Sequence, residues 1–348
     1  MVKRHRAVKQ GRRPTIIDVA QEANVGVMTV SRVINNNVTV KPATRAKVMS
    51  AIARVGYHPN DAARMLKGMQ AKMIGFIVPD LSDFFSSCFH AVQKVAMQHD
   101  YQTMVVVTGR NAIIENQQLE SLGNRHIAGL LIVTSGGDNR QLRSFQENGV
   151  PVVALDRPIA GLNVDAVLVE NREGAELGVS HLLEHGHKSV ASVGFDGDVF
   201  TVRERMEGYK QAMCSAGLEL QTHGNVQSLE QMEELVERWA TGKKRPTAVF
   251  SAQRITSIRL VQALHRYSLR IPQDIAVVGF DDFELADVLG TPITVVSQSP
   301  GSLAQRAAEI LFREIDRLQQ NQETEHQPAK VIFPTRLVIR ASCGCNAK

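Results

Sequence analysis

Three histidines form the most compact group of potential metal ligands in the chain. His181 and His185 lie four residues apart in a segment predicted to be helical, and His187 follows them. Two imidazoles at this spacing can bind one metal ion from one face of a helix. The stretch LLEHGHKSV is, however, also typical of a helix C-terminus, where cationic side chains interact favourably with the helix dipole. No acid or cysteine is placed as a further ligand, so we expect no metal site.

Sequence motifs for enzyme chemistry are absent from the 348 residues. The chain contains no GxGxxG, no P-loop and no GxSxG, so nucleotide-cofactor and serine-hydrolase chemistry have no local anchor. Its four cysteines are scattered and follow no signal peptide, which favours a reduced, cytoplasmic protein. No apolar run has the length of a membrane span. We therefore expect neither an enzyme nor a cofactor nor a membrane protein.

Residues 15–35, TIIDVAQEANVGVMTVSRVIN, have the pattern of two short helices joined by a tight turn. Thr15 and Asp18 resemble a capping box and predict a first helix from about residue 17 to residue 23. The Asn-Val-Gly sequence at 24–26 then breaks the helix, because Asn and Gly tolerate the geometry of a turn.

The second of these helices has two chemically different faces. It is predicted to start near Val27, and its inward stripe consists of Val30, Val33 and Ile34. The opposite face carries Val27, Met28, Ser31 and Arg32. Arg32 could pair bidentately with a guanine edge, which is the chemistry of a helix-turn-helix DNA reader. A helical hairpin with a merely solvated polar face is the alternative that this segment alone leaves open.

Charge is distributed unevenly along the chain. Residues 1–70 contain thirteen Lys and Arg against three acids, a net charge of +10, whereas the rest of the chain carries −5. A basic head on a mildly acidic body is typical of a protein in which one part binds a polyanion. Because no amphipathic basic helix or apolar anchor accompanies the charge, nucleic acid is favoured over a membrane. Residues 1–14 are expected to be a flexible basic tail that binds phosphate non-specifically, or an ordinary disordered extension.

Two more segments complete the N-terminal region. Apolar residues at helical spacing predict a third helix from about Pro42 to Gly56, which would close a small three-helix core. Residues 58–68, HPNDAARMLKG, contain helix-forming residues but are too few to form a stable helix alone. We expect their ordering to depend on a partner, such as DNA together with the same segment of a second subunit.

These segments together resemble the N-terminal region of the LacI/GalR family of repressors. The resemblance is carried by TIIDVAQEANVGVMTVSRVIN, TRAKV, GYHPN and AARML, and it extends from about residue 15 to residue 342. It implies a helix-turn-helix headpiece over 15–59, a hinge helix with linker over 60–71, an effector-binding core over 72–342 and a tail over 343–348. It also implies a homodimer that binds a palindromic double-stranded DNA operator, and a sugar-like effector in place of a cofactor.

The resemblance assigns roles to individual headpiece residues. The base-reading positions would be Val27, Met28 and Arg32, and the phosphate contacts would be Thr15, Thr29, Ser31 and Asn35. The minor-groove hinge positions would be Ala63 and Leu66, with Leu66 as an apolar wedge. Val27 and Met28 can read thymine methyls and shape only, so Arg32 should supply most of the hydrogen-bonded readout. Gly26 stands where many members have a capping serine or threonine, so the start of the second helix is expected to be less well fixed.

The remainder of the chain has the pattern of an α/β protein. Short apolar runs alternate with longer amphipathic segments, which indicates parallel sheets covered by helices on both faces. The expected strands are 73–78, 102–107, 129–133 and 150–155, followed by 166–169, 190–195, 248–250 and 275–280. By the resemblance, two doubly wound subdomains are arranged as in periplasmic sugar-binding proteins. They would comprise 72–169 with 298–326 and 170–296 with 327–342, and the crossovers would lie near 169–172, 296–300 and 325–331.

An effector is expected in the cleft between the two sheets, because ligands of open parallel sheets bind beyond the carboxyl ends of the strands. Strand ends and the family pattern together nominate Phe84, Phe85, Arg157, Asp165, Arg205, Gln253, Arg254 and Asp281. The aromatic pair would pack against a sugar or base, and Arg205 and Asp281 would bind polar groups of the effector. Arg203 and Asp282 are interpreted as surface or helix-cap charges.

The largest departure from the family pattern is SAQR at residues 251–254, where an Asn-Asp pair is usual. The exchange of an acid for Arg254, with Arg157 and Arg205 nearby, favours an effector that bears a carboxylate or phosphate, such as a sugar acid or phosphosugar. An Arg254 that simply turns outward is the alternative.

Two classes of function remain. The first is a ligand-controlled repressor of carbohydrate or related catabolic genes, and the second is a solute-binding protein with an incidental basic N-terminus. The absence of an export signal and the presence of AARML favour the first. The eight residues ASCGCNAK after Arg340 are too few for leucine heptads, which favours a dimer over a tetramer.

Overall fold

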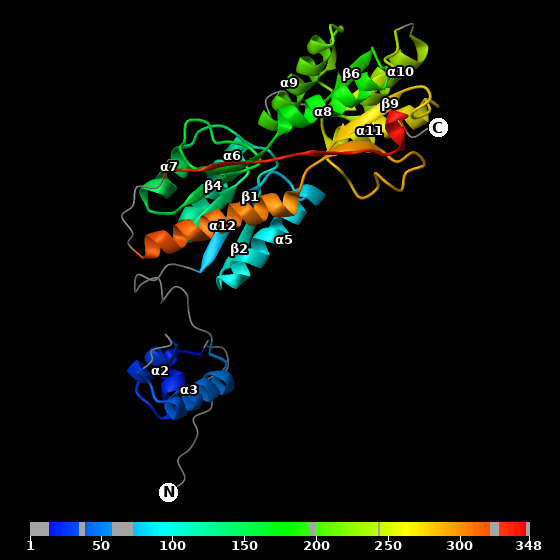
Figure 1. The fold of residues 1–348 in the computed structure, drawn as a ribbon. Helices are drawn as coiled ribbons and strands as arrows, with labels where there is room; N and C mark the ends of the chain where they lie inside the picture. Colours follow the sequence, from blue (N-terminus) through cyan, green and yellow to red (C-terminus); the bar gives the residue numbers. More distant parts are fainter. Residues whose placement is uncertain are drawn as a thin grey trace. The chain divides into compact units, whose positions relative to one another are not determined.

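The computed structural model describes residues 14–34, 39–57, 72–194, 199–242, 244–320 and 327–345. The chain divides into two compact units, Met1–Ala71 and Lys72–Lys348. Figure 1 shows the helices of the first unit and the two lobes of the second. The expected hinge residues Ala63 and Leu66 and the expected phosphate contact Asn35 lie outside the described residues.

In the part of the first unit that the structure describes, three helices surround a small apolar core. They are α1 (Ile16–Ala23), α2 (Val27–Ile34) and α3 (Pro42–Val55). The core is made by Val19, Ala20, Ala23, Val30, Val33, Val48 and Ala51. Valine and alanine suffice here because the helices are short and approach closely. The three predicted helices and the inward stripe of the second one are confirmed.

Short-range hydrogen bonds set the ends of these helices. The Asp18 carboxylate accepts from the Thr15 N–H and from the Thr15 hydroxyl, each at 2.7 Å, which fixes the start of α1. Asn24 ends α1 in the left-handed conformation, at a φ of 50°. The carbonyl of Gly26 accepts from Thr29 N–H at 2.9 Å, and this backbone hydrogen bond marks the start of α2.

The first lobe of the second unit is a six-stranded parallel sheet in the order β11-β5-β4-β3-β1-β2. Its strands are β1 (Met73–Val78), β2 (Gln102–Val107), β3 (Gly129–Ile132), β4 (Val152–Leu155), β5 (Asp165–Val169) and β11 (Lys330–Phe333). Its helices are α5 (Asp83–Gln98), α6 (Ala112–Gly123), α7 (Arg140–Glu147) and α12 (Pro300–Gln319). Side chains of α5 and α12 share one apolar cluster with the sheet, and those of α6 and α7 share a second on its other face.

The second lobe repeats this plan in the order β12-β10-β9-β8-β6-β7, with β12 antiparallel to β10. Its strands are β6 (Val190–Val193), β7 (Gln221–His223), β8 (Ala248–Ser251), β9 (Ala276–Phe280), β10 (Thr294–Ser297) and β12 (Arg336–Val338). Its helices are α8 (Asn171–Glu184), α9 (Phe200–Ser215), α10 (Leu229–Thr241) and α11 (Arg254–Arg266), followed by the 3-10 helix η1 (Ala341–Cys343). Helices α8 and α9 pack in one cluster, and α10 and α11 in another.

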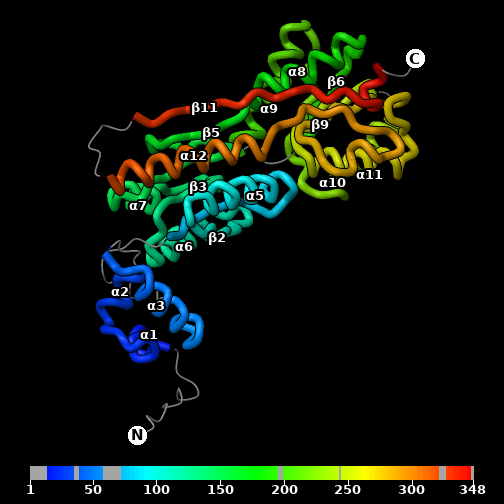
Figure 2. The backbone as a smooth tube through the Cα atoms, turned by 60° about the horizontal axis from the view of Figure 1, so that its bottom comes forward, coloured from blue at the N-terminus to red at the C-terminus, as the bar shows by residue number. Residues whose placement is uncertain are grey.

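The chain crosses between the lobes at three places (Figure 2). Two of them, after β5 and after β10, lie where they were expected. The third was expected near 325–331, which is wrong, because residues 330–333 form β11 and pair with β5 in the first sheet. The crossover falls at residues 334–335, and the chain therefore re-enters the second lobe at β12. No helix in the described part of the chain is long and apolar enough to cross a bilayer.

Helices α8 and α9 are in close backbone contact at Gly208. A Cβ atom built at this position would lie 2.1 Å from the carbonyl oxygen of Arg172 and 2.9 Å from Cβ of Ala175. The backbone of α8 therefore occupies the space that a side chain on α9 would need. This contact fixes how α9 carries Arg205, one turn earlier, against the start of α8.

We predict that Gly208→Ala lowers the free energy of unfolding by about 1–3 kcal/mol, as overpacking of a close contact does. Gly123→Ala in α6 is the matched control, because its new Cβ would meet only Phe145, at 3.8 Å. Replacing glycine within a helix should leave that variant neutral or more stable by up to about 1 kcal/mol. Urea unfolding of both variants decides the point, and an unchanged Gly208→Ala midpoint would contradict the tight packing.

Candidate ligand-binding cleft and nucleic-acid interface

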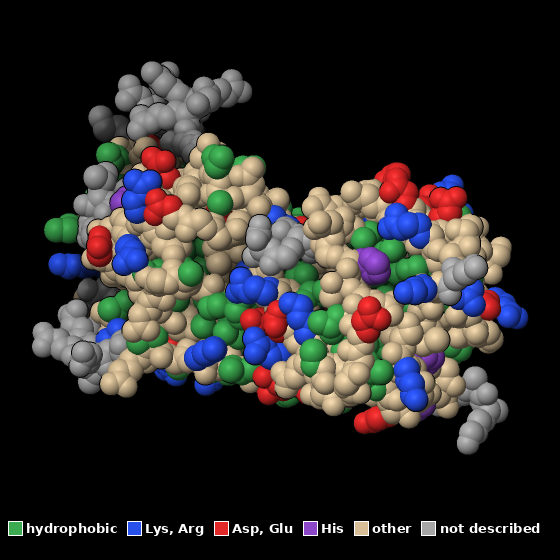
Figure 3. Space-filling model, turned by 90° about the horizontal axis from the view of Figure 1, so that it is seen from above, with side chains coloured by type: hydrophobic (Ala, Val, Ile, Leu, Met, Phe, Trp, Pro, Cys, Tyr) green, Lys and Arg blue, Asp and Glu red, His purple; other side chains and the backbone are tan. Residues whose placement is uncertain are grey.

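A cleft of about 1040 Å³ lies between the two lobes. Its walls come from the segments that follow strands β1, β4, β8, β9 and β10, together with the first turns of α5, α9 and α11. These segments meet because the carboxyl ends of parallel strands lie at one edge of each sheet, and the two edges face each other. Figure 3 shows basic and acidic side chains mixed at the waist of the molecule, between the lobes.

Two aspartates occupy equivalent positions in the two lobes. Asp156 follows β4 and Asp281 follows β9, and each has a left-handed backbone, with φ values of 67° and 73°. Their N–H groups donate across the sheet at 2.9 Å, to the carbonyl oxygens of Val167 and Val296 respectively. Non-glycine residues in this conformation are strained, and they concentrate at functional sites. In both lobes, therefore, the same left-handed backbone conformation places an aspartate side chain at the cleft.

Arg205 forms several hydrogen bonds that organise one wall of the cleft. Its Nη1 and Nη2 donate to the two oxygens of Asp281 at 2.9 Å and 3.4 Å. Its Nε donates to Asn171 Oδ1 at 2.8 Å, and Nη1 also donates to the carbonyl oxygen of Ala252 at 3.0 Å. The guanidinium lies 3.7 Å from the ring centroid of Phe280, and Arg205 is only 4% exposed. The residue therefore ties α8, the β8 end and the β9 end to one point on the cleft wall.

Asp156 and Arg157 form a second buried pair on the first lobe. Arg157 Nε lies 3.5 Å from Asp156 Oδ2, and Nη1 donates to the carbonyl oxygen of Thr134 at 3.2 Å. Burial raises the pKa of Asp156, against the opposing effect of the guanidinium groups of Arg157 and Arg205. This carboxyl therefore holds its proton at a higher pH than an ordinary aspartate does.

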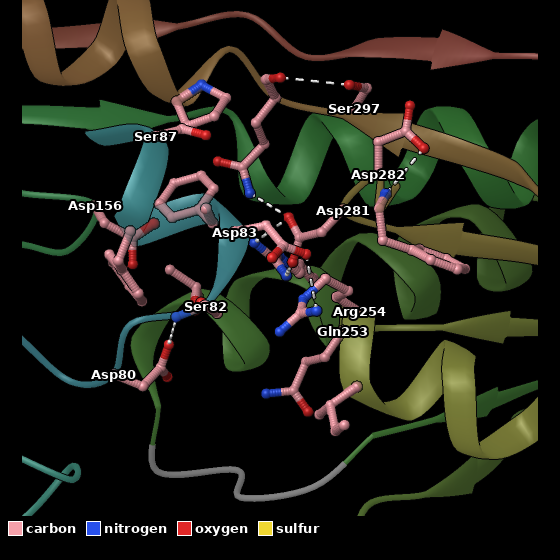
Figure 4. Close-up of a pocket in the computed structure, with 18 of the residues that line it drawn as sticks. Asp80, Ser82, Asp83, Ser87, Asp156, Gln253, Arg254, Asp281, Asp282 and Ser297 are labelled. Atoms are coloured by element: carbon pink, nitrogen blue, oxygen red, sulfur yellow. Dashed lines mark hydrogen bonds and ion pairs between the residues drawn. The ribbon is translucent and has the colours of Figure 1, made fainter. Parts of the chain in front are cut away.

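The start of α5 faces the start of α11 across the cleft (Figure 4). Arg254 Nη1 donates to Asp83 Oδ2 at 3.2 Å, and this ion pair joins the second lobe to the first. Behind Asp83, the rings of Phe84 and Phe85 meet edge to face at 5.0 Å, and Phe85 is buried. The Arg254 and Asp83 side chains remain 27% and 55% exposed, so water screens this pair.

Two glutamines add polar groups that the ion pairs do not supply. Gln253 is buried beside Arg254, and its Oε1 accepts from the Thr256 hydroxyl at 3.3 Å. Gln298 donates from Nε2 to Asp281, whereas its Oε1 is buried with no hydrogen-bond partner among the described residues. An oxygen in this state can accept a hydrogen bond from a ligand hydroxyl.

Most of the expected effector residues line the cleft. They are Phe84, Phe85, Arg157, Arg205, Gln253, Arg254 and Asp281. Asp165 does not, because it stands at the amino end of β5, where its Oδ1 accepts from Ala329 N–H at 3.0 Å. That position was wrong for a physical reason: the cleft lies at the opposite end of this strand. Asp282, expected to be a surface or cap charge, lines the cleft and accepts from both terminal nitrogens of Arg340.

Several lining residues were not anticipated. They include Asp80, Ser82, Asp83, Arg110, Gln298 and Arg340. Hydrogen bonds from Ser82 and Arg110 lower the pKa of Asp80 despite its burial, so its carboxylate is held in the charged form. The position of Asp80 and Ser82 directly after β1 was the available signal, since β1 was predicted with correct ends.

The lining contains six arginines and seven acidic residues. Arg110, Arg157, Arg205, Arg254 and Arg340 each contact an aspartate. The cleft is therefore not cationic as a whole. An anion that binds Arg254 must displace Asp83, and the cost is small because water already screens this pair. Arg259, the sixth arginine, donates to the carbonyl oxygen of Gln227 at 2.6 Å.

In the first unit, one face of α2 carries exposed apolar side chains and an arginine. Val27 and Met28 are 43% and 74% exposed, and Arg32 is exposed beside them. Thr29 and Ser31 are half-buried on the same helix, and Thr15 lies half-buried before α1. Large apolar side chains exposed on a short helix next to an arginine form a surface able to contact thymine methyls and guanine edges.

The histidine cluster differs from its sequence-based interpretation. Cys345 Sγ lies 3.6 Å from His181 Nε2, and potential ligand atoms of His181, His185 and Cys345 lie within 4.8 Å of one another. The expectation that no cysteine stands near these histidines is therefore wrong. His187 is not part of this group, and its Nδ1 lies 3.1 Å from the Thr247 hydroxyl.

We predict that Arg205→Ala lowers the free energy of unfolding by about 3–5 kcal/mol, because it leaves the Asp281 carboxylate without its partner. Arg203→Ala on the same helix is the control, since Arg203 is exposed and should change stability by less than about 0.5 kcal/mol. Adding Asp281→Asn to Arg205→Ala should recover part of the loss. Equal losses for the two arginine variants in chemical denaturation would show that Arg205 does not organise the cleft.

Comparison with known proteins places both units in one family. Residues 15–60 match the profile described as bacterial regulatory proteins, lacI family, and residues 179–343 match that of a periplasmic binding protein-like domain. The ribose operon repressor of Haemophilus influenzae is 31% identical over 319 residues, covering 89% of this chain and 94% of that protein.

Two solved structures of regulators are similar in fold to this chain over nearly its whole length. A complex of the transcriptional regulator CelR with cellobiose has 28% identity and a TM-score of 0.67, and covers 95% of this chain and 100% of that one. The lac repressor dimer bound to operator and the anti-inducer ONPF has 25% identity and a TM-score of 0.80, and covers 95% and 99%. The chain belongs to the lacI family of bacterial regulatory proteins, and it is a DNA-binding transcriptional regulator with a core of the periplasmic-binding-protein type.

Proposed function

We propose that this regulator is a repressor that binds a palindromic operator as a homodimer and responds to a small polar effector in the inter-lobe cleft. The observation that carries the proposal is the pairing of an exposed reading face on α2 with a cleft lined by fixed polar groups and two phenylalanines. A solute-binding protein would need the cleft but not the reading face. The same proposal places the protein in the cytoplasm, where its operator is.

Base reading is proposed for Val27, Met28 and Arg32. The two apolar side chains would contact thymine methyls, and Arg32 would donate to a guanine. Thr15, Thr29, Ser31 and Asn35 are proposed to contact phosphates, which position the helix but carry no sequence information. Ala63 and Leu66 are proposed as minor-groove contacts of the hinge, with Leu66 as the wedge that kinks the duplex.

We predict that Arg32→Ala weakens operator binding by about 1–3 kcal/mol and relaxes preference at one base pair of each half-site. Arg54→Ala is the matched control, because Arg54 is exposed on α3 and pairs with Glu22 at 2.9 Å. Mobility shifts with a palindromic operator and with scrambled DNA, at one salt concentration, give the comparison. Arg32→Ala binding both DNAs as the parent does would contradict the base-reading role.

Dimer formation is supported by apolar side chains exposed on the core. Val107, Ile113 and Ile114 follow one another around the carboxyl end of β2, and Ile113 is 70% exposed. On the second lobe, Leu285 and Val288 are 61% and 70% exposed in the segment after β9. Exposed apolar side chains of this size favour association with another chain. A two-fold dimer would present two reading helices to successive major grooves, which is why a palindrome is proposed.

The effector is proposed to be a sugar acid or phosphosugar. Its hydroxyls would meet the Asp281 carboxylate and the free Gln298 Oε1, with the phenylalanines of α5 against its apolar face. Its anionic group would take the place of Asp83 on Arg254. Arg157 and Arg205 are buried and already bonded to acids and carbonyl groups, whereas Arg254 is partly exposed and pairs with an aspartate across the cleft.

A route from the cleft toward the DNA-binding unit is proposed along β1. This strand begins at Met73, directly after the linker, and its carboxyl end delivers Asp80 and Asp83 to the cleft. An effector that draws the lobes together would act on the segment that the linker enters. Its influence on operator binding would equal the difference in its affinity for the two arrangements of the lobes.

We predict that Arg254→Gln weakens binding of an anionic sugar effector by about tenfold to 100-fold, the loss of one charge-assisted hydrogen bond. Arg266→Gln, on the same helix but exposed and paired with Glu233, should bind as the parent does. Calorimetry with a panel of sugars, sugar acids and phosphosugars tests this. Tight binding of a neutral sugar with no response to any anionic one would exclude the anionic effector while leaving the repressor proposal intact.

A further inference from the structure

The C-terminal Cys343-Gly344-Cys345 sequence lies against the end of α8 because the preceding residues are held firmly in the second sheet. Ser342 Oγ accepts from Thr294 N–H at 2.7 Å and donates to the carbonyl oxygen of Val277 at 2.6 Å. Gly344 then turns the chain in the left-handed conformation, at a φ of 82°. This turn carries Cys345 to His181, from which it is separated by 164 residues in the sequence.

The resulting cluster contains two imidazoles and two thiols. His181 and His185 present neighbouring rings, with centroids 4.4 Å apart, from the last turn of α8. Cys345 Sγ lies 3.6 Å from His181 Nε2 and 2.6 Å from Cys343 Sγ. His181 and Cys343 are buried, whereas His185 is exposed and Cys345 half-buried, so one side of the cluster is open to entry from solvent.

The separations among His181, His185 and Cys345 suit a tetrahedral metal ion. Cys343 is not counted as a ligand, because its Sγ lies 2.6 Å from Cys345 Sγ, whereas two thiolates on one zinc ion lie roughly 3.8 Å apart. With zinc–sulfur and zinc–nitrogen bonds of about 2.3 Å and 2.0 Å, a ligand nitrogen and a ligand sulfur lie roughly 3.5 Å apart. The observed distance from His181 Nε2 to Cys345 Sγ is 3.6 Å. The donor atoms of His181, His185 and Cys345 already lie within 4.8 Å of one another, so small side-chain rotations bring them to one centre.

The hydrogen bonding of His185 orients it for the same purpose. Its Nδ1 lies 2.7 Å from the carbonyl oxygen of His181, which can only accept, so Nδ1 carries the proton. The lone pair is then on Nε2. A carbonyl that accepts from the second ring nitrogen is the usual support of a histidine metal ligand, because it fixes both tautomer and ring orientation.

We propose that His181, His185 and Cys345 form a binding site for a zinc-like divalent metal ion, which fastens the C-terminal segment to α8. Two nitrogen donors and one sulfur donor match the preference of zinc among divalent ions, and a water molecule would take the fourth position. Cys345 releases its thiol proton on binding, and no redox step is involved. The segment held in this way includes Arg340, which binds Asp282 in the cleft wall.

The test is a titration of reduced, metal-stripped full-length protein with Zn²⁺, followed by calorimetry and thermal melting. We expect one equivalent per chain and a melting temperature that rises with Zn²⁺ concentration, because the ion binds only the folded cluster. Cys345→Ser and His185→Asn should each lower the Zn²⁺ affinity at least about tenfold. Cys214→Ser is the matched control, since Cys214 is exposed in α9 outside the cluster, and it should bind Zn²⁺ as the parent does.

Substitution of Co²⁺ gives a second readout that does not depend on stability. Tetrahedral Co²⁺ with thiolate ligands should show intense visible absorption in the parent protein and in Cys214→Ser, and lose the thiolate band in Cys345→Ser. Zn²⁺ binding that is equal in parent and Cys345→Ser would overturn the assignment. A Cys343–Cys345 disulfide, found by mass analysis in protein prepared under reducing conditions, would overturn it as well.

Discussion

The buried contact between Arg205 and Asp281 is the interaction on which the cleft depends. A guanidinium that is 4% exposed must have its charge and its donors satisfied, and Arg205 achieves this by bonding to Asp281, Asn171 and the Ala252 carbonyl. Each partner belongs to a different segment of the second lobe. The close approach of α8 and α9 at Gly208 holds the helix that carries Arg205, so backbone packing and buried charge specify the same geometry.

The equivalence of Asp156 and Asp281 extends this arrangement to the whole core. The two lobes share a strand order, and the same left-handed turn follows the fourth strand of each lobe in chain order, β4 in one and β9 in the other. In both lobes an arginine neutralises the aspartate, Arg157 in one and Arg205 in the other. The ion pair of Arg254 with Asp83 differs, because it joins the lobes and is open to water. The cleft thus combines rigid walls with one contact that an entering ligand can exchange.

Much of the fold was predictable because its signals are local. The apolar runs at 73–78 and 102–107 are β1 and β2 with the predicted ends, and the helix-turn-helix follows from capping, turn and periodicity within twenty residues. Strands β7 and β12 have three residues each, and the apolar run in β11 has only three residues, which alternate between exposed and half-buried positions, so the signals of these strands are weak. The third crossover was misplaced for that reason.

The site was predicted less completely because its contacts join distant segments. Residues that follow recognisable strands, such as Arg157 and Asp281, were found. Gln298 was missed because it follows β10, a strand that was not predicted, and Arg340 enters the cleft from the segment after β12. Asp165 shows that proximity to a strand is not sufficient, since only the carboxyl end faces the cleft. The cysteines near His181 could not be anticipated, because η1 returns the C-terminus to α8 only in the folded chain.

Effector binding in the cleft is proposed to be coupled to operator binding. The most direct test is to measure whether each ligand changes the affinity for the other. Operator affinity of the full-length protein would be measured with and without saturating effector, and effector affinity with and without saturating operator, at one salt concentration. Linkage requires both affinities to change by the same factor, which we expect to lie between about 5-fold and 150-fold. An effector that binds the cleft and leaves operator affinity unchanged would contradict the account.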